Sequence, residues 1–228
     1  MTTVPPEETR RSLAAQRRYD RQAALFDFWE APMEMLALGR LRRRLWSQVA
    51  SGRILEIGVG TGKNLPYHPA AARMVAVDIS PRMLRRAAAR ARRLGRGTDL
   101  VLADAERLPF RSGSFDAAAA TFVFCSVPDP IAGLREVRRT ARAGGRIHLL
   151  EHVRASNPLI GRLMDLLNPL WVRVSGANIN RDTVANVESA GIRLDEVESR
   201  AGIIRLIRGS AEDKAAGEEA AARAEEVV

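Results

Sequence analysis

Glycines recur at every second position where an apolar strand meets a helix. The turn holds Gly58, Gly60 and Gly62, directly after the strand-like run Arg53–Ile57. Glycine in such a turn lets backbone amides approach a polar or anionic ligand closely, because no Cβ intervenes. Ligands of open α/β sheets bind at this edge, outside the carboxyl ends of the strands. The segment from Glu56 to Asn64 is therefore predicted to bind a ligand.

Three ligand classes compete for this turn. A nucleoside triphosphate requires GxxxxGK followed by Ser or Thr. Here Ile57 stands where the first glycine must be, and Asn64 stands where Ser or Thr must be. A dinucleotide prefers GxGxxG, whereas the turn reads GxGxG. S-adenosylmethionine (SAM) has no diphosphate, and its methionine carboxylate and ammonium can use a glycine turn. The spacing therefore favours SAM.

Acids follow the next two strand-like runs. Asp78 stands near the end of Arg73–Ile79, where a carboxylate can accept hydrogen bonds from both ribose hydroxyls. NAD would need the same acid, so Asp78 does not discriminate between the two cofactors. Asp104 follows the run Asp99–Ala103, where it can accept a hydrogen bond from the adenine amino group. This second acid favours SAM further.

Strands must alternate with helices to bring these groups to one edge. The remaining strand-like runs are Phe115–Val123, Gly145–Val153, Arg193–Glu198 and Ile203–Arg208. Helical stretches lie between most of them, at Pro81–Leu94, Ile131–Ala141, Leu159–Val174 and about Arg181–Ala190. This alternation predicts a doubly wound α/β fold with a mostly parallel sheet. The short gap around Gly202 predicts that the last two strands form an antiparallel hairpin.

Residues 1–50 and the C-terminal tail differ in composition from the region between them. Roughly Glu7 to Ala50 reads as two amphipathic helices meeting at Pro32, and apolar residues at 25–29 lie near Arg17, Arg18 and Arg21. Residues 211–228 hold six carboxylates against one lysine and one arginine. We therefore expect a helical lid over 1–50, a ligand-binding domain over 51–210 and a flexible acidic tail.

Charge and composition bound the partners. The 228 residues carry a net charge of +9, and nine arginines face four carboxylates between Arg10 and Trp46. A basic cluster beside apolar residues attracts anionic lipid or nucleic acid. The chain has no apolar run of the ~18–20 residues that span a bilayer and no secretory signal, so we expect a soluble or peripheral protein. A single cysteine, Cys125, excludes a thiolate zinc cluster, and no metal site is predicted.

The run from about Arg53 to Arg154 resembles the class I SAM-dependent methyltransferases, with the glycine turn, ribose acid, adenine-side acid and following strand in order. The resemblance implies a Rossmann-like sheet of seven strands, SAM as cofactor and no metal. It implies cofactor contacts for Gly58, Gly60, Asp78, Ile79, Met83, Asp104, Ala105 and Thr121. Further candidates in the same segments are Glu56, Gly62, Asn64 and Glu106.

The flanking segments carry a narrower resemblance. Tyr19-Asp20, Glu151–Arg154 and the stretch Gly176–Thr183 resemble the soluble bacterial phosphatidylethanolamine N-methyltransferases. Lipid-droplet and thiol methyltransferases share a similar G-x-N-x-x-R stretch, and quinone C-methyltransferases share the core. The resemblance implies N-methylation of phosphatidylethanolamine toward phosphatidylcholine, with a lipophilic thiol or quinone as the alternative acceptor.

Six residues in the segments that carry this resemblance are candidates for contacts with the acceptor. Tyr19 is expected to hold methylated ammonium by cation–π attraction or to take up a proton, and Glu151 to offset the ammonium charge. The candidates for the lipid phosphate are Arg154 and Arg181, and those for the headgroup are Asn178 and Asn180. In the competing interpretation Glu151 and Arg154 form an ion pair at the surface, and the two asparagines cap the following helix.

A lipid acceptor implies a membrane surface. We expect the N-terminal helices to contact anionic lipid at the inner face of the cytoplasmic membrane, and the helix Leu159–Val174 to form a second contact or an acyl-chain groove. The rival classes are an RNA methyltransferase and a non-catalytic membrane scaffold. Aromatic residues make up only 5% of the chain, which disfavours stacking on nucleic-acid bases. Nucleic acid is therefore not expected as a partner.

Overall fold

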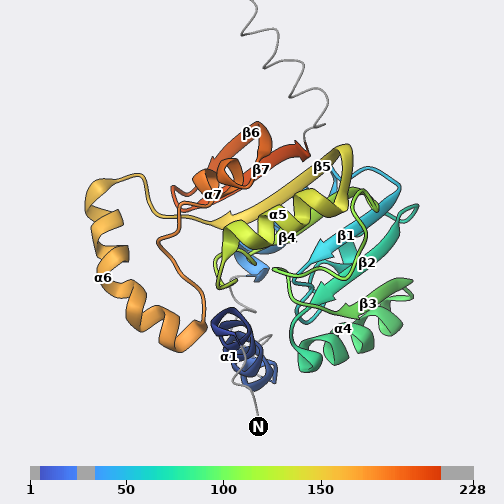
Figure 1. Ribbon diagram of the computed structural model, residues 1–228, viewed down its shortest axis with the longest axis horizontal. Helices are drawn as coiled ribbons and strands as arrows, with labels where there is room; N and C mark the ends of the chain where they lie inside the picture. The colour runs from blue at the N-terminus through green and yellow to red at the C-terminus, as the bar shows by residue number, and fades with distance from the viewer. Residues whose placement is uncertain (1–5, 25–33, 212–228) are drawn as a thin grey trace, which may run out of the picture.

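A computed structural model describes residues 6–24 and 34–211. Seven strands form one sheet in the order β3-β2-β1-β4-β5-β7-β6 (Figure 1). The strands are β1 (Arg53–Ile57), β2 (Arg73–Asp78), β3 (Thr98–Leu102), β4 (Phe115–Thr121), β5 (Ala141–His152), β6 (Ile192–Arg200) and β7 (Ile204–Ala211). The first five run parallel, and β7 pairs antiparallel with both β5 and β6. The seven-stranded, mostly parallel sheet and its antiparallel hairpin are confirmed.

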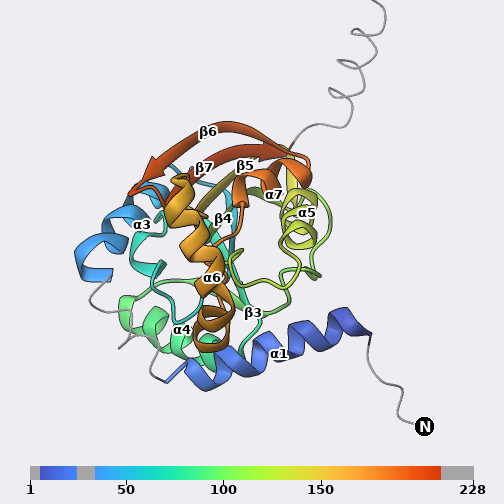
Figure 2. The same cartoon turned by 90° about the vertical axis from the view of Figure 1, so that its left-hand side faces the viewer.

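The helices connect and flank these strands (Figures 1 and 2). They are α1 (Glu7–Gln22), α3 (Gly39–Trp46), α4 (Pro81–Leu94), α5 (Pro130–Thr140), α6 (Pro158–Ser175) and α7 (Thr183–Ser189). A π-helical turn, η1 (Glu34–Leu38), leads into α3, and a 3₁₀ turn, η2 (Leu65–Tyr67), follows the glycines. Side-chain caps fix several starts: Ser80 accepts from the Met83 amide at α4, and Asp129 from the Ala132 amide at α5.

Alternation along the central strands divides the core between the two faces of the sheet. Leu55 and Ile57 of β1 face the side covered by α5 and α7, whereas Ile54 faces α3. β4 contributes four consecutive alanines, Ala117 to Ala120, which are buried on both faces. Alanine has low intrinsic strand propensity, but its small side chain lets the flanking helices approach closely. The core therefore sits directly beneath the carboxyl edge that holds the glycine turn.

The described helices of the N-terminal region pack against the rest of the protein. α3 buries Leu45 and Trp46 against the sheet, and α1 lies across the carboxyl edge beside α4 (Figure 2). Pro32 and the apolar run 25–29 lie outside the described residues, as does the tail 212–228. None of the helices in the described ranges is long and apolar enough to cross a membrane.

Candidate cofactor and acceptor site

The glycine turn adopts a backbone that only glycine accommodates easily. Gly58, Gly60 and Gly62 all have positive φ, at 66°, 55° and 84°. A Cβ on Gly58 would come within 2.4 Å of Val123, so this position also requires glycine for packing. A Cβ on Gly60 would meet nothing within 4 Å. The turn is thus packed against the protein at Gly58 and open at Gly60, as a ligand-facing loop requires.

Asp78 connects the glycine turn to the start of α4. One carboxylate oxygen accepts from the Gly60 amide at 2.8 Å, and the other accepts from the Ser80 amide at 2.9 Å. Burial is the main cause that raises the pKa of Asp78 to about 6, and these two hydrogen bonds oppose the rise. Each oxygen retains a lone pair for a further donor. The ribose role predicted for Asp78 needs those remaining lone pairs.

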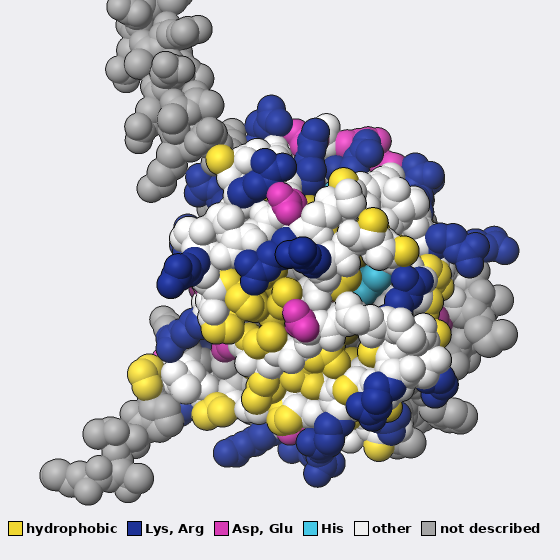
Figure 3. Space-filling view, turned by 90° about the vertical axis from the view of Figure 1, so that its right-hand side faces the viewer, with side chains coloured by type: hydrophobic (Ala, Val, Ile, Leu, Met, Phe, Trp, Pro, Cys, Tyr) yellow, Lys and Arg dark blue, Asp and Glu magenta, His cyan; other side chains and the backbone are white. Residues whose placement is uncertain are grey.

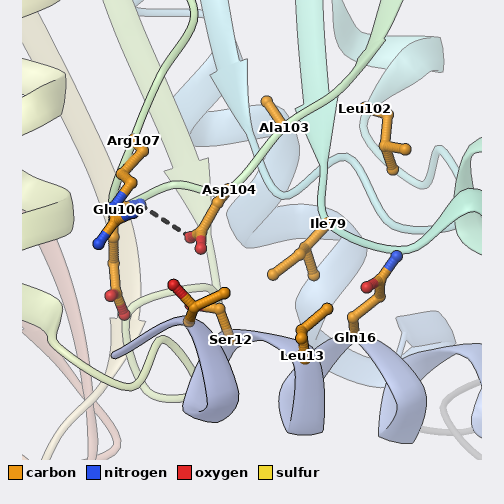
Figure 4. A pocket seen from close by; sticks show the side chains of 10 residues that line it. Ser12, Leu13, Gln16, Ile79, Leu102, Ala103, Asp104, Glu106 and Arg107 are labelled. Carbon is orange, nitrogen blue, oxygen red and sulfur yellow. Dashed lines mark hydrogen bonds between the residues drawn. The ribbon is translucent and has the colours of Figure 1, made fainter. Parts of the chain in front are cut away.

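A cavity of about 320 Å³ lies between α1 and the carboxyl ends of β2 and β3 (Figure 4). Ile79 and Asp104 line it from the sheet side, and Ser12 and Gln16 from α1. Asp104 accepts from the Glu106 amide at 3.0 Å, which directs its carboxylate toward this space. A planar base with an exocyclic amino group fits a cavity that has an apolar wall and a carboxylate, that of Asp104, to accept from the amino group.

α1 is fixed over the site by its C-terminal half. Asp20 accepts from the Ser80 hydroxyl at 2.6 Å and from the Arg82 amide at 3.1 Å, so α1 is held at the start of α4. Tyr19 lies beside Asp78, Cys125 and Ser126, and burial raises the pKa of its phenol well above the usual value. The structure therefore brings Tyr19 to the cofactor edge, with its hydroxyl protonated at neutral pH.

A buried polar network beneath the turn was not predicted from the sequence. Arg42, only 6% exposed, reaches from α3 to Asn64 at 3.0 Å and to Thr121 at 2.5 Å. Asn64 in turn donates to Glu56 at 2.6 Å and to Thr121 at 2.8 Å. Arg42 thus contacts two of the predicted cofactor residues directly, Asn64 and Thr121, and a third, Glu56, through Asn64.

Further partners complete this network. Arg42 pairs with Glu34 at 3.0 Å, and Glu56 contacts the buried His68 ring at 2.8 Å. The guanidinium of Arg42 also lies 5.4 Å from the Phe122 ring centre. One signal in the sequence could have found Arg42: it stands four residues after Leu38 and four before Trp46, on the buried stripe of α3.

The remaining predicted cofactor residues lie along the same edge with other partners. Met83 is buried in α4, and its amide donates to the capping Ser80 hydroxyl. Glu106 lines the cavity and accepts from the Asp129 amide at 2.8 Å, which anchors the start of α5. Ala105 packs beside the core. Their direct contact with a cofactor stays a prediction.

Glu151 lies at the end of β5, under the loop that follows β4. Its Oε1 accepts from the Val123 amide at 2.9 Å and from the Phe124 amide at 3.1 Å, and the carboxyl is fully buried. Burial raises the pKa of Glu151 to about 7, against these hydrogen bonds and the nearby Arg181. Glu151 therefore shapes the loop beside Tyr19; its catalytic role stays a prediction.

The predicted acceptor residues Asn178 and Arg181 join two loops. Asn178 donates to the Cys125 carbonyl from its backbone at 2.7 Å and from its side chain at 3.1 Å. The half-buried Arg181 donates to the Phe124 carbonyl and, at 2.7 Å, to the Val127 carbonyl. The G-x-N-x-x-R stretch is thus fixed to the loop after β4, at the edge where Tyr19 lies.

Arg154 and Asn180 meet at Asp165 of α6 rather than at Glu151. Arg154 contacts the Asp165 carboxylate through two of its nitrogens, at 2.8 and 3.1 Å, and Asn180 donates to it at 3.0 Å. The expected alternative pairing of Glu151 with Arg154 is therefore wrong, because Glu151 is directed inward and Arg154 outward. Neither asparagine caps α7, whose cap is Asp182.

The polar groups at this edge fit the parts of SAM. The open side of Gly60, the carboxylate of Asp78 and the cavity beside Asp104 suit the amino-acid, ribose and base parts of that cofactor. Among the described residues, no group of three His, Cys, Asp or Glu side chains is placed to hold a metal ion.

Comparison with known proteins assigns the family. Residues 55–149 match the model of a methyltransferase domain. Phosphatidylethanolamine N-methyltransferase from Cereibacter sphaeroides is 33% identical over 155 residues, covering 64% of this chain and 72% of that protein. The chain therefore belongs to the class I SAM-dependent methyltransferases.

Other relatives carry different acceptors in their names. Thiol S-methyltransferase TMT1B from Homo sapiens is 31% identical over 161 residues, covering 65% of this chain and 66% of that protein. The quinone C-methyltransferase UbiE from Geobacter sp. is 34% identical over 155 residues, covering 61% of this chain and 63% of that protein. The chain thus spans just under two thirds of the length of these two relatives.

The fold is shared with solved methyltransferases. A possible histamine N-methyltransferase from Thermotoga maritima superposes with a TM-score of 0.68 at 23% identity, over 87% of this chain and all of that one. At this identity the likeness shows the fold alone.

Proposed function

We propose that this chain transfers a methyl group from SAM to the amino nitrogen of phosphatidylethanolamine, at the inner face of the cytoplasmic membrane. The observation that carries this proposal is the junction of Tyr19, the loop after β4 and the G-x-N-x-x-R stretch at the open cofactor edge. The bacterial phospholipid relative, similar over 72% of its length, supports the choice of acceptor.

The residues of the chain act by binding and positioning. Bound SAM would supply the electrophilic methyl group, and transfer from a sulfonium is an in-line displacement that depends on orientation. Asp78 and Asp104 would orient the cofactor. The aromatic ring of Tyr19 would hold the ammonium product by cation–π attraction. The raised pKa of its phenol keeps the side chain neutral, so it would not act as a phenolate.

The buried carboxyl of Glu151 lies behind the loop next to Tyr19 and would offset positive charge that develops on the acceptor. The acceptor nitrogen must lose its proton before it attacks. The pKa of Glu151, near 7, suits a group that exchanges a proton at neutral pH. In this proposal the lipid phosphate lies near Arg181 and Asn178, outside the loop they anchor.

The second candidate acceptor is a lipophilic thiol or quinone. It is favoured by the thiol and quinone relatives, which match this chain at identities similar to that of the phospholipid enzyme. Such acceptors need the same positioning but no contact with a phosphate. The two candidates therefore differ in the part played by Arg181.

The test is methyl transfer from labelled SAM to phosphatidylethanolamine in mixed anionic liposomes, with thiol, quinone and RNA acceptors in parallel. We expect label in the mono-, di- or trimethylated lipid. Label in a thiol or quinone alone would overturn the phospholipid acceptor and keep the methyltransferase assignment. Label in RNA alone would overturn the lipophilic acceptor class. Absence of label in every acceptor, with SAM binding intact, would contradict both candidates.

A further inference from the structure

α6 exposes an apolar face to solvent. Eight of its side chains are between 45% and 76% exposed: Leu159, Ile160, Leu163, Leu166, Leu167, Leu170, Trp171 and Val174. At 100° per residue these side chains occupy one continuous side of the helix. The helix stands away from the sheet on the left of Figure 1. A surface helix normally turns such a side toward the core.

The polar side of α6 is the side that faces the protein. Asp165 contacts Arg154, and Asn168 bonds Asn178 and the Ile179 amide at 3.2 and 2.9 Å. Gly161 lies so close to Arg154 that a Cβ there would come within 2.6 Å of the guanidinium. These contacts hold the helix with its apolar face outward, so this face cannot turn toward the core while they persist.

Basic residues border the apolar face. Arg162 and Arg173 stand four residues before and seven residues after Leu166, and so lie along one edge of the face. The C-terminal end of α6 also meets α1: Gln22 donates to the Val174 carbonyl at 2.8 Å, and Arg18 packs over Gly176. Arginines at the margin of an apolar face that also carries a tryptophan are typical of segments that lie in an anionic lipid interface.

The N-terminal helices offer less apolar surface in their described parts. The apolar side of α3 is buried against the sheet, and α1 exposes Leu13 as its large apolar side chain. The opposite end of the molecule also carries many basic side chains, spread around apolar patches (Figure 3). Basic charge beside apolar patches therefore does not mark one docking surface. α6 stands out because it carries eight of the twelve exposed large apolar side chains among the described residues.

We propose that the apolar face of α6 docks on an anionic lipid bilayer and so brings the acceptor edge beside Tyr19 and Asn178 to the membrane. The choice of a lipid partner rests on the proposed function, whereas the exposure of the apolar face is observed independently of that function. Vesicle binding is measured without methyl transfer, so the two proposals fail separately. A protein that binds vesicles but methylates a thiol keeps this inference and loses the phospholipid acceptor.

The experiment is sedimentation with vesicles of phosphatidylcholine containing phosphatidylglycerol, against phosphatidylcholine alone, in moderate salt. The double variant Leu166→Gln/Leu170→Gln removes two exposed leucines that make no core contact. We expect its affinity for the mixed vesicles to fall on the order of a hundredfold. Leu94→Gln changes an apolar position on α4 that is 41% exposed; it is the control and should bind as the wild type does.

Two further measurements separate charge from insertion. Arg162→Gln/Arg173→Gln should weaken binding roughly tenfold on the mixed vesicles and little on neutral ones. Tryptophan emission should shift to shorter wavelength on vesicle binding, and Trp171→Phe should remove this shift. Unchanged vesicle affinity in the double leucine variant would overturn the proposal. So would a wild-type dimer that the leucine variant dissociates, combined with no vesicle binding, because α6 would then cover a second copy.

Discussion

Asp78 serves the cofactor turn and the start of α4 with a single carboxylate. Its two oxygens already accept from Gly60 and Ser80, so the ribose contact would share an acceptor that also holds the turn in place. Loss of this side chain should therefore affect both the binding contact and the shape of the loop.

We predict that Asp78→Ala lowers SAM affinity at least about a hundredfold, since two hydrogen bonds to a charged acceptor are lost. Because the pKa of Asp78 is raised to about 6, its protonation should also weaken binding in the wild type as pH falls through about 6. Calorimetry from pH 5 to pH 8 measures both effects. Asp78→Asn should bind weakly without this pH dependence; full affinity in either variant would remove Asp78 from the ribose site.

Tyr19 permits a second prediction, because its phenol stays protonated at neutral pH. Tyr19→Phe should keep most of the turnover, since the aromatic face remains. Tyr19→Leu should lose roughly tenfold, in line with a cation–π contact of about 1–2 kcal/mol. The measurement is kcat with thermal unfolding as control. A large loss in the phenylalanine variant would show that the hydroxyl itself is needed.

Glu151 gives a prediction about stability. Its folded pKa, about 7, lies above the usual glutamate value of 4.5, so the folded state binds the proton more tightly than the unfolded chain. Its contribution to stability is then present below pH 4.5 and is lost as pH rises through about 7. Between pH 5 and pH 8 the wild type should lose about 2 kcal/mol relative to Glu151→Gln. Denaturant unfolding of both proteins at the two pH values measures this.

The catalytic role assigned to Glu151 adds a second expectation for the same variant. Glu151→Gln should lower turnover with SAM affinity unchanged. If instead turnover is unchanged while stability follows the expected pH dependence, Glu151 only holds the loop after β4 in place.

At the residue scale, the sequence predicted what depends on local spacing. The glycine turn and Asp78 follow their strands directly, so their position at the edge needed no knowledge of tertiary contacts. Arg42 was missed because its partners stand 22 and 79 residues away. The competing interpretation, which paired Arg154 with Glu151, was wrong for a similar reason: Asp165 approaches Arg154 through the position of α6, which no local pattern specifies.

At the scale of elements, α1 covers the cofactor cavity and is attached to α4 near its C-terminal end. Asp20 joins it to Ser80 and Arg82, and Arg86 donates to the Ala24 carbonyl at 3.0 Å. Since one wall of the cavity is α1, cofactor affinity should depend on this attachment.

We predict that Asp20→Ala weakens SAM binding roughly tenfold and speeds amide exchange in α1, because a charged acceptor at the attachment is lost. Glu7→Ala is the matched control: it removes the exposed Glu7–Arg11 pair of the same helix and should leave binding unchanged. Asp20→Asn, which keeps an acceptor oxygen, should recover part of the affinity. Equal exchange rates in all variants would show that α1 is held by other contacts.

Element types were predicted well, and their bounds less well. α4 matches its predicted range, Pro81–Leu94, because Ser80 and Pro81 mark its start. β4 ends at Thr121, two residues earlier than predicted, where Phe122 takes a positive φ of 57°. For α6 the sequence left two interpretations, a membrane contact or a lid packed on the sheet, because its apolar periodicity is the same in both. Its polar contacts with the body place the apolar side outward.

At the scale of the whole molecule, cofactor binding should be visible as stability. A ligand at about a hundred times its dissociation constant stabilises a protein by about 2.7 kcal/mol. For a chain of this size that should raise Tm by roughly 5–10 °C. Thermal unfolding with SAM, NAD and ATP in parallel measures it, and SAM alone should act. The Asp78→Ala variant should show no shift, whereas the α6 leucine variant should show the full one.

The order of strands has a consequence for synthesis. β7 (Ile204–Ala211) lies between β5 and β6, so the twelve-residue β5 has no partner on one side until the last described strand has left the ribosome. An unpaired strand of that length is a template for association with other chains. Nascent chains that stop before Ile204 would therefore carry a complete glycine turn on an incomplete, aggregation-prone sheet. Such chains would require binding by chaperones or degradation by proteases.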